Sequence, residues 1–180
     1  MAKASSLRGI ENGKSASVAA VPPGASVEQP QAAYIVPAPA RLAAGAWLVY
    51  RDQFLNSSAQ AQISEIRKGA PARNLVGAAE ALRLPRERVY ELVGLSASTA
   101  KRKLARDESL DSLMTERLTR LGAIERLAEE TFGDALLASE WLQTVNLGLG
   151  NLTPLSMLDT EIGCREVSRV LNAIAYGGAA

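Results

Sequence analysis

The amino-acid sequence predicts an all-α protein, and three features of its composition support that prediction. Hydrophobic residues make up 47% of the 180 residues and charged residues 22%, so most of the chain can bury enough apolar surface to fold. Alanine, leucine, glutamate and arginine recur, and these residues are good helix formers. Aromatic residues make up only 4%, and runs of β-branched residues are scarce, which disfavours sheets.

The composition also excludes several classes of function. The chain has no histidine and one cysteine, Cys164, so it can build neither an intrachain disulfide nor the usual zinc sites and histidine-based triads. We therefore expect no metal, no cofactor and no catalytic activity. No uncharged apolar run reaches the roughly 18 residues of a membrane span, and the N-terminus lacks the apolar core of a secretory signal. These features predict a cytoplasmic protein without a membrane partner.

Charge is distributed unevenly along the chain, although the formal net charge is only +1. Residues 61–106 carry ten basic and four acidic groups, whereas residues 107–180 carry five and twelve. A basic middle favours an anionic partner such as nucleic acid, and an acidic end favours a different partner.

Residues 1–45 are expected to form a flexible extension. They are rich in alanine, serine, proline and glycine, as in SASVAAVPPGAS and YIVPAPA, and show no sustained helical or strand period. The segment 44–55, AGAWLVYRDQFL, is the first with real apolar content. Its pattern is compatible with a short strand or with a helix that packs on the folded body.

Helical patterns begin at Ala59 and predict a small helical domain over residues 59–107. The first helix, AQISEIRKG, ends at Gly69 with two basic residues in its last turn, where they complement the helix dipole. The next segment, NLVGAAEALRL, is a helix with apolar residues at the i, i+3, i+4, i+7 spacing. These residues are Leu75, Ala78, Ala79 and Leu82.

Two further helices complete this domain as a helix-turn-helix. Pro85 opens PRERVYELVGL, because proline is tolerated at the start of a helix, and Gly94 ends it. Ser96 then caps SASTAKRKLAR. Short helices joined through Gly-Leu-Ser are typical of a helix-turn-helix motif.

The last helix of the motif carries the candidate DNA-binding residues. Ala100 and Leu104 are four residues apart and face the core, which leaves cations and hydroxyls pointing outward. Such groups suit phosphate contacts and entry into a DNA groove, although a solvated basic face has the same pattern. The candidates are Ser98, Thr99, Lys101, Arg102 and Lys103.

Residues 110–180 are expected to form a second helical domain, which begins with two amphipathic helices. Asp111 opens a long helix whose buried stripe comprises Met114, Leu118, Leu121, Ile124 and Ala128. Glu116 and Arg120 form an outward i, i+4 pair on it. Gly133 ends this helix, and Asp134 caps the next. The apolar face of that next helix comprises Leu137, Ala138, Trp141 and Leu142, and we expect Trp141 to be a core residue.

The end of the chain is predicted to contain a tight turn, a short helical stub and a final helix. Gly150 and Asn151 are the residue types that best tolerate a left-handed backbone. Thr153 and Pro154 form a cap and a first helical residue, and Thr160 caps the final helix. One apolar stripe follows that helix: Cys164, Val167, Val170, Leu171 and Ile174. Cys164 is therefore expected to be a buried hydrophobic residue and not a reactive thiol.

The segment 116–177 resembles the C-terminal toxin-binding domain of the Xre/MbcA/ParS antitoxins, the partners of RES-domain toxins. The shared features are a Trp-Leu pair, an Asn-x-x-Leu-Gly turn, a Thr-Pro-Leu stub, a glycine near the start of the last helix, and a final Ile-x-Tyr-Gly. The motif residues are Trp141, Asn146, Gly150, Thr153, Pro154 and Gly163. The resemblance extends upstream to about Ile63, where GLSASTAKRKLAR is similar to the Xre-like helix-turn-helix, with Ser98 in place of the usual arginine.

The resemblance implies an antitoxin. Its helix-turn-helix domain would bind operator DNA and repress its own operon, and its C-terminal domain would cover the active site of a cognate RES-domain toxin that acts on NAD. The implied toxin-binding residues are Ile174, Tyr176, Gly177 and Gly178. A homodimer within a larger toxin-antitoxin complex is expected, because DNA half-sites are usually read by twofold-symmetric proteins. The alternative is a stand-alone transcriptional regulator whose C-terminal domain mediates dimerisation.

Overall fold

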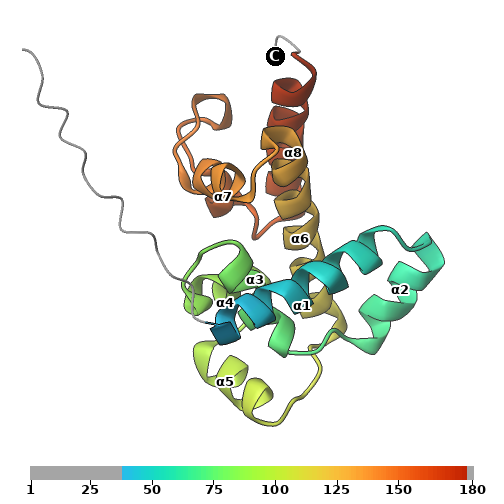
Figure 1. The fold of residues 1–180 in the computed structure, drawn as a ribbon. Coiled ribbons are helices and arrows are strands. Elements are labelled where there is room, and N and C mark those ends of the chain that lie inside the picture. The colour runs from blue at the N-terminus through green and yellow to red at the C-terminus, as the bar shows by residue number, and fades with distance from the viewer. Residues whose placement is uncertain (1–37, 178–180) are drawn as a thin grey trace, which may run out of the picture. The chain divides into compact units, whose positions relative to one another are not determined.

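The computed structural model describes residues 38–177, and the prediction of a helical protein is confirmed for them (Figure 1). Within this range the backbone forms helices, turns and two isolated β-bridges, but no strand. The expected extension over residues 1–37 and the predicted site residue Gly178 lie outside the described residues. No helix in the range is long and apolar enough to cross a membrane.

The first five helices cover the N-terminal part of the described chain. They are α1 (Ala38–Leu55), α2 (Ala59–Lys68), α3 (Arg73–Ala81), α4 (Arg86–Val93) and α5 (Ala97–Ala105). The remaining elements are α6 (Ser112–Phe132), α7 (Ala135–Gln143), the 3₁₀ turns η1 (Leu147–Leu149) and η2 (Pro154–Met157), and α8 (Glu161–Tyr176).

Helix α1 begins earlier than the sequence predicted. The extension was expected to reach residue 45, but α1 starts at Ala38 and includes Pro39 in its first turn. Proline needs no hydrogen-bond partner there, because the first backbone N–H groups of a helix have none within the helix. The proline-rich composition therefore marks the start of a helix as well as the end of the extension. Of the two alternatives for residues 44–55, the structure has the helix.

Helix α6 connects the two halves of the described chain (Figure 1). Near its start the Thr115 hydroxyl accepts a 2.9 Å hydrogen bond from the backbone N–H of Ala70, and Arg117 donates to the carbonyl of Val93 at 3.4 Å. Further along, α6 packs against α7 and α8. The predicted domain boundary at residues 107–110 lies in the loop before α6, but the first turns of α6 pack with the preceding domain.

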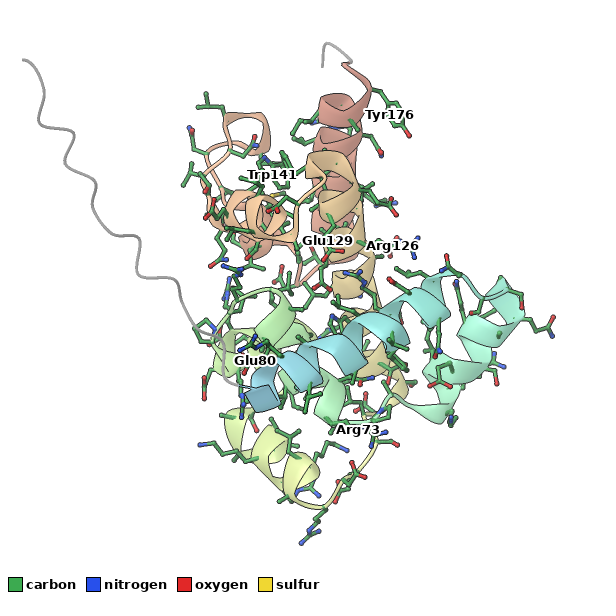
Figure 2. All side chains as sticks on the ribbon, in the orientation of Figure 1. Arg73, Glu80, Arg126, Glu129, Trp141 and Tyr176 are labelled. Carbon is green, nitrogen blue, oxygen red and sulfur yellow. The ribbon has the colours of Figure 1, made fainter. Side chains whose placement is uncertain are left out.

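A buried polar network joins α1 to α6. Trp47 Nε1 donates to Glu125 Oε2 at 2.8 Å, and Arg51 Nη1 lies 3.3 Å from the same oxygen. Arg51 also donates to Glu129 at 2.9 Å, on the part of α6 labelled in Figure 2. Burial raises the pKa of Glu125 from 4.5 to about 7, although Arg51 and Trp47 both favour its charged form. The network fixes α1 against α6 through side chains 78 residues apart in sequence.

Most of the predicted helix ends are confirmed. The left-handed residues Gly94 and Gly133 end α4 and α6. Ser96 and Asp111 cap α5 and α6 by accepting hydrogen bonds from backbone N–H groups. Asp134, Thr153 and Thr160 do the same for α7, η2 and α8. These local signals set the length of each helix and so position the exposed surfaces described next.

Candidate functional site

The predicted helix-turn-helix consists of α4, a three-residue turn and α5. Gly94 adopts φ 75°, and the N–H of Leu95 donates to Tyr90 at 2.7 Å, which closes the end of α4. The left-handed backbone favours glycine at position 94. Arg117 from α6 donates to the carbonyl of Val93, which ties the end of α4 to α6.

Helix α5 buries one face and exposes the other, as predicted. Ala100 is fully buried, and Leu104 packs partly against the core. Of the five predicted DNA-binding residues, three are exposed: Ser98, Lys101 and Arg102. The other two, Thr99 and Lys103, are partly buried. The Thr99 hydroxyl accepts from Ser96, and Lys103 donates to the carbonyl of Ser109 at 2.8 Å.

Glu108 was not singled out from the sequence, yet it lies against the basic end of α5. Its carboxylate is 3.0 Å from Arg102, 3.6 Å from Lys103 and 3.7 Å from Arg106. The chain reaches this position because Asp107 adopts a left-handed φ of 49° and the N–H of Glu108 donates to Lys103. The available signal was an Asp-Glu pair directly after a basic helix. One carboxylate thus partly neutralises the surface that would meet phosphates.

Helix α7 contributes buried residues from only part of its predicted apolar face. Ala138 and Leu142 are buried, and Trp141 is partly buried against Phe132 at 5.6 Å between ring centroids. Leu137 is 51% exposed, so the prediction that it faces the core is wrong. Instead the hydroxyl of Ser139 is buried and donates to the carbonyl of Leu82 at the end of α3. That hydrogen bond turns α7 so that Leu137 points outward.

The turn between α7 and α8 is built by the predicted motif residues. The side-chain oxygen of Asn146 accepts from the backbone N–H of Gly148 at 2.8 Å. The backbone N–H of Asn146 donates to the carbonyl of Leu152 at 3.0 Å. Gly150 and Asn151 adopt φ values of 66° and 63°, as their residue types predicted. The rigid turn exposes three apolar side chains, which sequence reasoning missed: Val145, Leu147 and Leu152.

Helix α8 approaches the preceding stub very closely. A side chain at Gly163 would collide with the carbonyl oxygen of Met157, so only glycine allows this packing. Cys164, Val167 and Leu171 face the core, as predicted, and burial raises the pKa of the Cys164 thiol. The thiol is therefore protonated and covered, as expected of a packing residue.

The last turn of α8 extends beyond this packed region. Ile174 is 45% exposed and Tyr176 is 85% exposed, and Gly177 ends the helix with φ 63°. Ile174 therefore departs from the predicted buried stripe. Two residues along a helix are roughly 200° apart, so Ile174 and Tyr176 lie on different sides of α8. Tyr176 points away from α7 (Figure 2). The structure thus presents Ile174, Tyr176 and Gly177 around the end of a helix and not on one flat face.

The described chain is thus a helix-turn-helix protein: an exposed basic helix lies in the motif, and a second helical unit with exposed apolar turns follows it. Two family models match these parts. The antitoxin Xre-like helix-turn-helix domain matches residues 61–122, and the antitoxin Xre/MbcA/ParS C-terminal toxin-binding domain matches residues 127–177. The first match ends and the second begins within α6.

Individual relatives agree with the family models. A Prs ADP-ribosylating antitoxin of Sphingobium sp. (strain YBL2) is 30% identical over 125 residues, which are 64% of this chain and 79% of the relative. An antitoxin Xre of Pseudomonas putida is 37% identical over 79 residues, or 44% of this chain and 50% of the relative. An antitoxin Xre of Photorhabdus laumondii is 35% identical over 90 residues, or 49% and 61%. The chain belongs to the Xre/MbcA/ParS antitoxin family.

Proposed function

We propose that this chain binds and neutralises a RES-domain toxin that acts on NAD, by covering the toxin's active site, and that it represses its own operon in the cytoplasm by binding operator DNA as a homodimer. It acts by binding and not by catalysis. The observation that carries the proposal is the end of α8, where the exposed last turn holds Ile174 and Tyr176 and no charged residue.

The end of α8 has the physical properties of a plug for a nucleotide pocket. The last carbonyl groups of a helix carry a partial negative charge, which suits a pocket that binds the pyrophosphate of NAD. Tyr176 offers a large aromatic anchor of the kind that dominates protein interfaces. The acidic C-terminal part, with twelve acidic and five basic residues over 107–180, would steer the chain towards such a pocket.

The name of the Sphingobium relative is compatible with a toxin that acts on NAD, because ADP-ribosylation takes its ADP-ribose from NAD. Two chemistries therefore fall within the proposal: hydrolysis of NAD, and transfer of ADP-ribose to a protein. A RES-domain toxin with the first activity is the form that we propose.

The DNA-binding part of the proposal rests on the exposed side of α5. Lys101 and Arg102 reach solvent, and Ser98 lies near the start of the helix, where backbone N–H groups also suit a phosphate. In an anisotropy assay with the chain's own promoter, Lys101→Ala with Arg102→Ala should weaken binding to all sequences. The salt slope should fall by about one for each phosphate that the variant no longer neutralises. Arg165→Ala, on α8, is the matched control and should change nothing.

The direct test of neutralisation is co-expression with a RES-domain toxin, if the operon of this chain encodes one. Growth, cellular NAD and transfer of labelled ADP-ribose to protein should be measured together. We expect growth and NAD to recover and the two proteins to purify as one complex. The complex could instead restore growth by suppressing the transfer of labelled ADP-ribose to protein. That result would support the antitoxin function, but the toxin would be an ADP-ribosyltransferase and not an NAD hydrolase. If growth does not recover and no complex forms, but the chain still binds its promoter, the chain would be a stand-alone regulator.

A further inference from the structure

The turn between α7 and α8 displays aliphatic side chains that the fold does not use. Leu147, the first residue of η1, is 85% exposed, and Val145 and Leu152, which flank it, are 59% and 51% exposed. Turns more often place glycine, asparagine, serine or aspartate at such positions. No residue from Trp141 to Leu158 is charged, although charged residues make up 22% of the chain. We call Val145, Leu147 and Leu152 the apolar turn.

The backbone of the turn is held without help from these side chains. The backbone N–H of Asn146 donates to the carbonyl of Leu152 at 3.0 Å, and that of Asn151 donates to the carbonyl of Asn146 at 3.1 Å. Gly150 and Asn151 supply the left-handed backbone that closes the turn. Polar side chains at positions 145, 147 and 152 would leave these hydrogen bonds unchanged, so the stability of the turn does not explain aliphatic residues there. Because the turn is already ordered, a partner could bind it at little entropic cost.

The apolar turn lies close to the end of α8. An atom added as a side chain at Gly148 would lie 3.8 Å from Val170, so η1 packs on α8. Val170 and Tyr176 are six residues apart, which is about 9 Å along the helix axis. An interface of standard size buries roughly 800 Å² on each partner and is therefore about 30 Å across. A toxin that covers the end of α8 would thus also contact the apolar turn.

We propose that the apolar turn is the surface by which this chain holds its toxin, inserted into an apolar hollow beside the toxin's active-site pocket. This inference rests on the proposed function and assigns two roles to two places: the apolar turn supplies affinity, and the end of α8 blocks the pocket. A toxin is favoured as the partner because the turn lies within residues 127–177, which match the toxin-binding domain. DNA is not favoured, because aliphatic side chains cannot neutralise phosphates.

The shape and chemistry of the turn define what it would bind. The turn protrudes from the body beside α8 (Figure 1). A hollow can enclose the tip at Leu147 together with both flanks, whereas a flat surface would leave part of the turn in water. The hollow should be lined by apolar or aromatic side chains, because a charge facing the turn would be buried without a partner. Leu147 would be the anchor, since it has the most exposed area to lose.

The first test measures affinity and inhibition separately, with the full-length chain and the RES-domain toxin of the co-expression test. The double variant Val145→Asp with Leu147→Asp should raise the dissociation constant about 100-fold, chiefly through faster dissociation, because the complex would bury two unpaired carboxylates. At saturating concentration it should still stop toxin turnover, because the end of α8 is intact. Both positions are exposed, so the free energy of unfolding in urea should match that of the wild type.

Two control variants separate the apolar contact from other effects. Leu147→Met keeps an apolar side chain of similar size and should bind the toxin as the wild type does. Ile162→Asp adds the same charge at an aliphatic position that is 67% exposed near the start of α8. This control should also bind as the wild type does, because position 162 lies far along α8 from the turn and from Tyr176.

A thiol footprint gives a second readout that does not depend on loss of affinity. Leu147→Cys should react rapidly with a thiol reagent in the free chain and much more slowly in the toxin complex. Arg165→Cys, exposed on α8, is the control and should react equally in both. The natural Cys164 is buried and should give little background.

Three results would overturn the proposal: unchanged affinity of the double variant, equal labelling of Leu147→Cys with and without toxin, or a double variant that binds tightly but no longer inhibits. The third result would place the block in the turn itself. A double variant that alters the mass of the chain alone in light scattering would assign the turn to a second copy, and would also overturn the proposal.

The same experiments distinguish this inference from the proposed function. If the wild type binds no RES-domain toxin, the proposed function fails and the role of the apolar turn fails with it. If the wild type and the double variant bind and inhibit equally well, the proposed function stands and only the role of the apolar turn is wrong.

Discussion

Helix α5 and the end of α8 are both exposed, but they are built differently. The basic side of α5 carries charges that are partly paired within the chain, with Glu108 against three cations and Lys103 held to a backbone carbonyl. The end of α8 carries no charge and is positioned by backbone features, namely the close approach at Gly163 and the caps on either side. The α5 surface can therefore be altered by single charge substitutions, whereas the α8 surface depends on the fold behind it.

The largest expected effect concerns Glu125, in the buried network that joins α1 to α6. The pKa of Glu125 is raised from 4.5 to about 7 in the folded chain, so the folded state holds this proton more tightly than the unfolded state. Stability should therefore fall as the pH rises from about 4.5 to 7, by roughly 3 kcal/mol from this group. Glu125→Gln keeps an acceptor for Trp47 and should flatten that pH dependence in urea unfolding.

Glu130→Gln is the matched control for Glu125, because Glu130 lies on the exposed side of the same helix. It should leave the pH dependence unchanged. If the free energy of unfolding changed equally with pH in the wild type and in Glu125→Gln, the pKa of Glu125 would not be raised in the folded chain.

The next effect concerns Gly163 and tests whether the end of α8 depends on the backbone behind it. Gly163→Ala puts a methyl group against the carbonyl of Met157, and we expect a loss of roughly 2–3 kcal/mol in urea unfolding. Toxin inhibition should weaken with it. Asn172→Ala, at an exposed position of α8, should cost nothing. A Gly163→Ala chain as stable as the wild type would mean that η2 and α8 adjust freely.

Tyr176→Ala tests the α8 end without disturbing the fold, because the side chain is 85% exposed. An aromatic anchor at an interface contributes about 2 kcal/mol or more, so the concentration for half-inhibition of the toxin should rise about 30-fold. Ile162→Ala removes an exposed apolar group at the other end of α8 and is the control. If Tyr176→Ala inhibits the toxin as well as the wild type and the control do, the end of α8 does not contact the toxin.

The smallest effect concerns Glu108 and the charge balance of α5. Glu108→Gln releases Arg102, Lys103 and Arg106 for contact with phosphates, and affinity for promoter DNA should rise about threefold at low salt. The gain should shrink as salt is added, because screening weakens every pair involved. Glu140→Gln, on α7, is the control. Unchanged or weaker binding in Glu108→Gln would show that Glu108 positions the cations instead of competing with DNA.

Local chemistry made much of this fold predictable from sequence. Gly94, Gly133 and the Gly150-Asn151 pair adopt the left-handed backbone that their residue types favour. Ser96, Asp111 and Thr160 cap the helices that follow them. Each of these features depends on residues within a turn or two, so a single sequence carries the information.

Features that depend on distant contacts were not predictable in the same way. The pairing of Trp47 with Glu125 spans 78 residues and has no local signature. Leu137 fits the helical period of α7, but the hydrogen bond from Ser139 to Leu82 rotates it into solvent. Glu108 follows a basic helix in the sequence, but only the left-handed turn at Asp107 brings it back against three cations.

Truncation after Asn172 shows whether the end of α8 blocks the toxin, as we propose. NAD turnover by the purified toxin should be titrated with the full chain and with the truncated chain, while complex formation is followed separately. We expect the full chain to stop turnover at stoichiometric amounts, whereas the truncated chain should still bind but leave most of the activity. Equal inhibition by the two chains would mean that the end of α8 does not block the toxin and that another part of the C-terminal domain does.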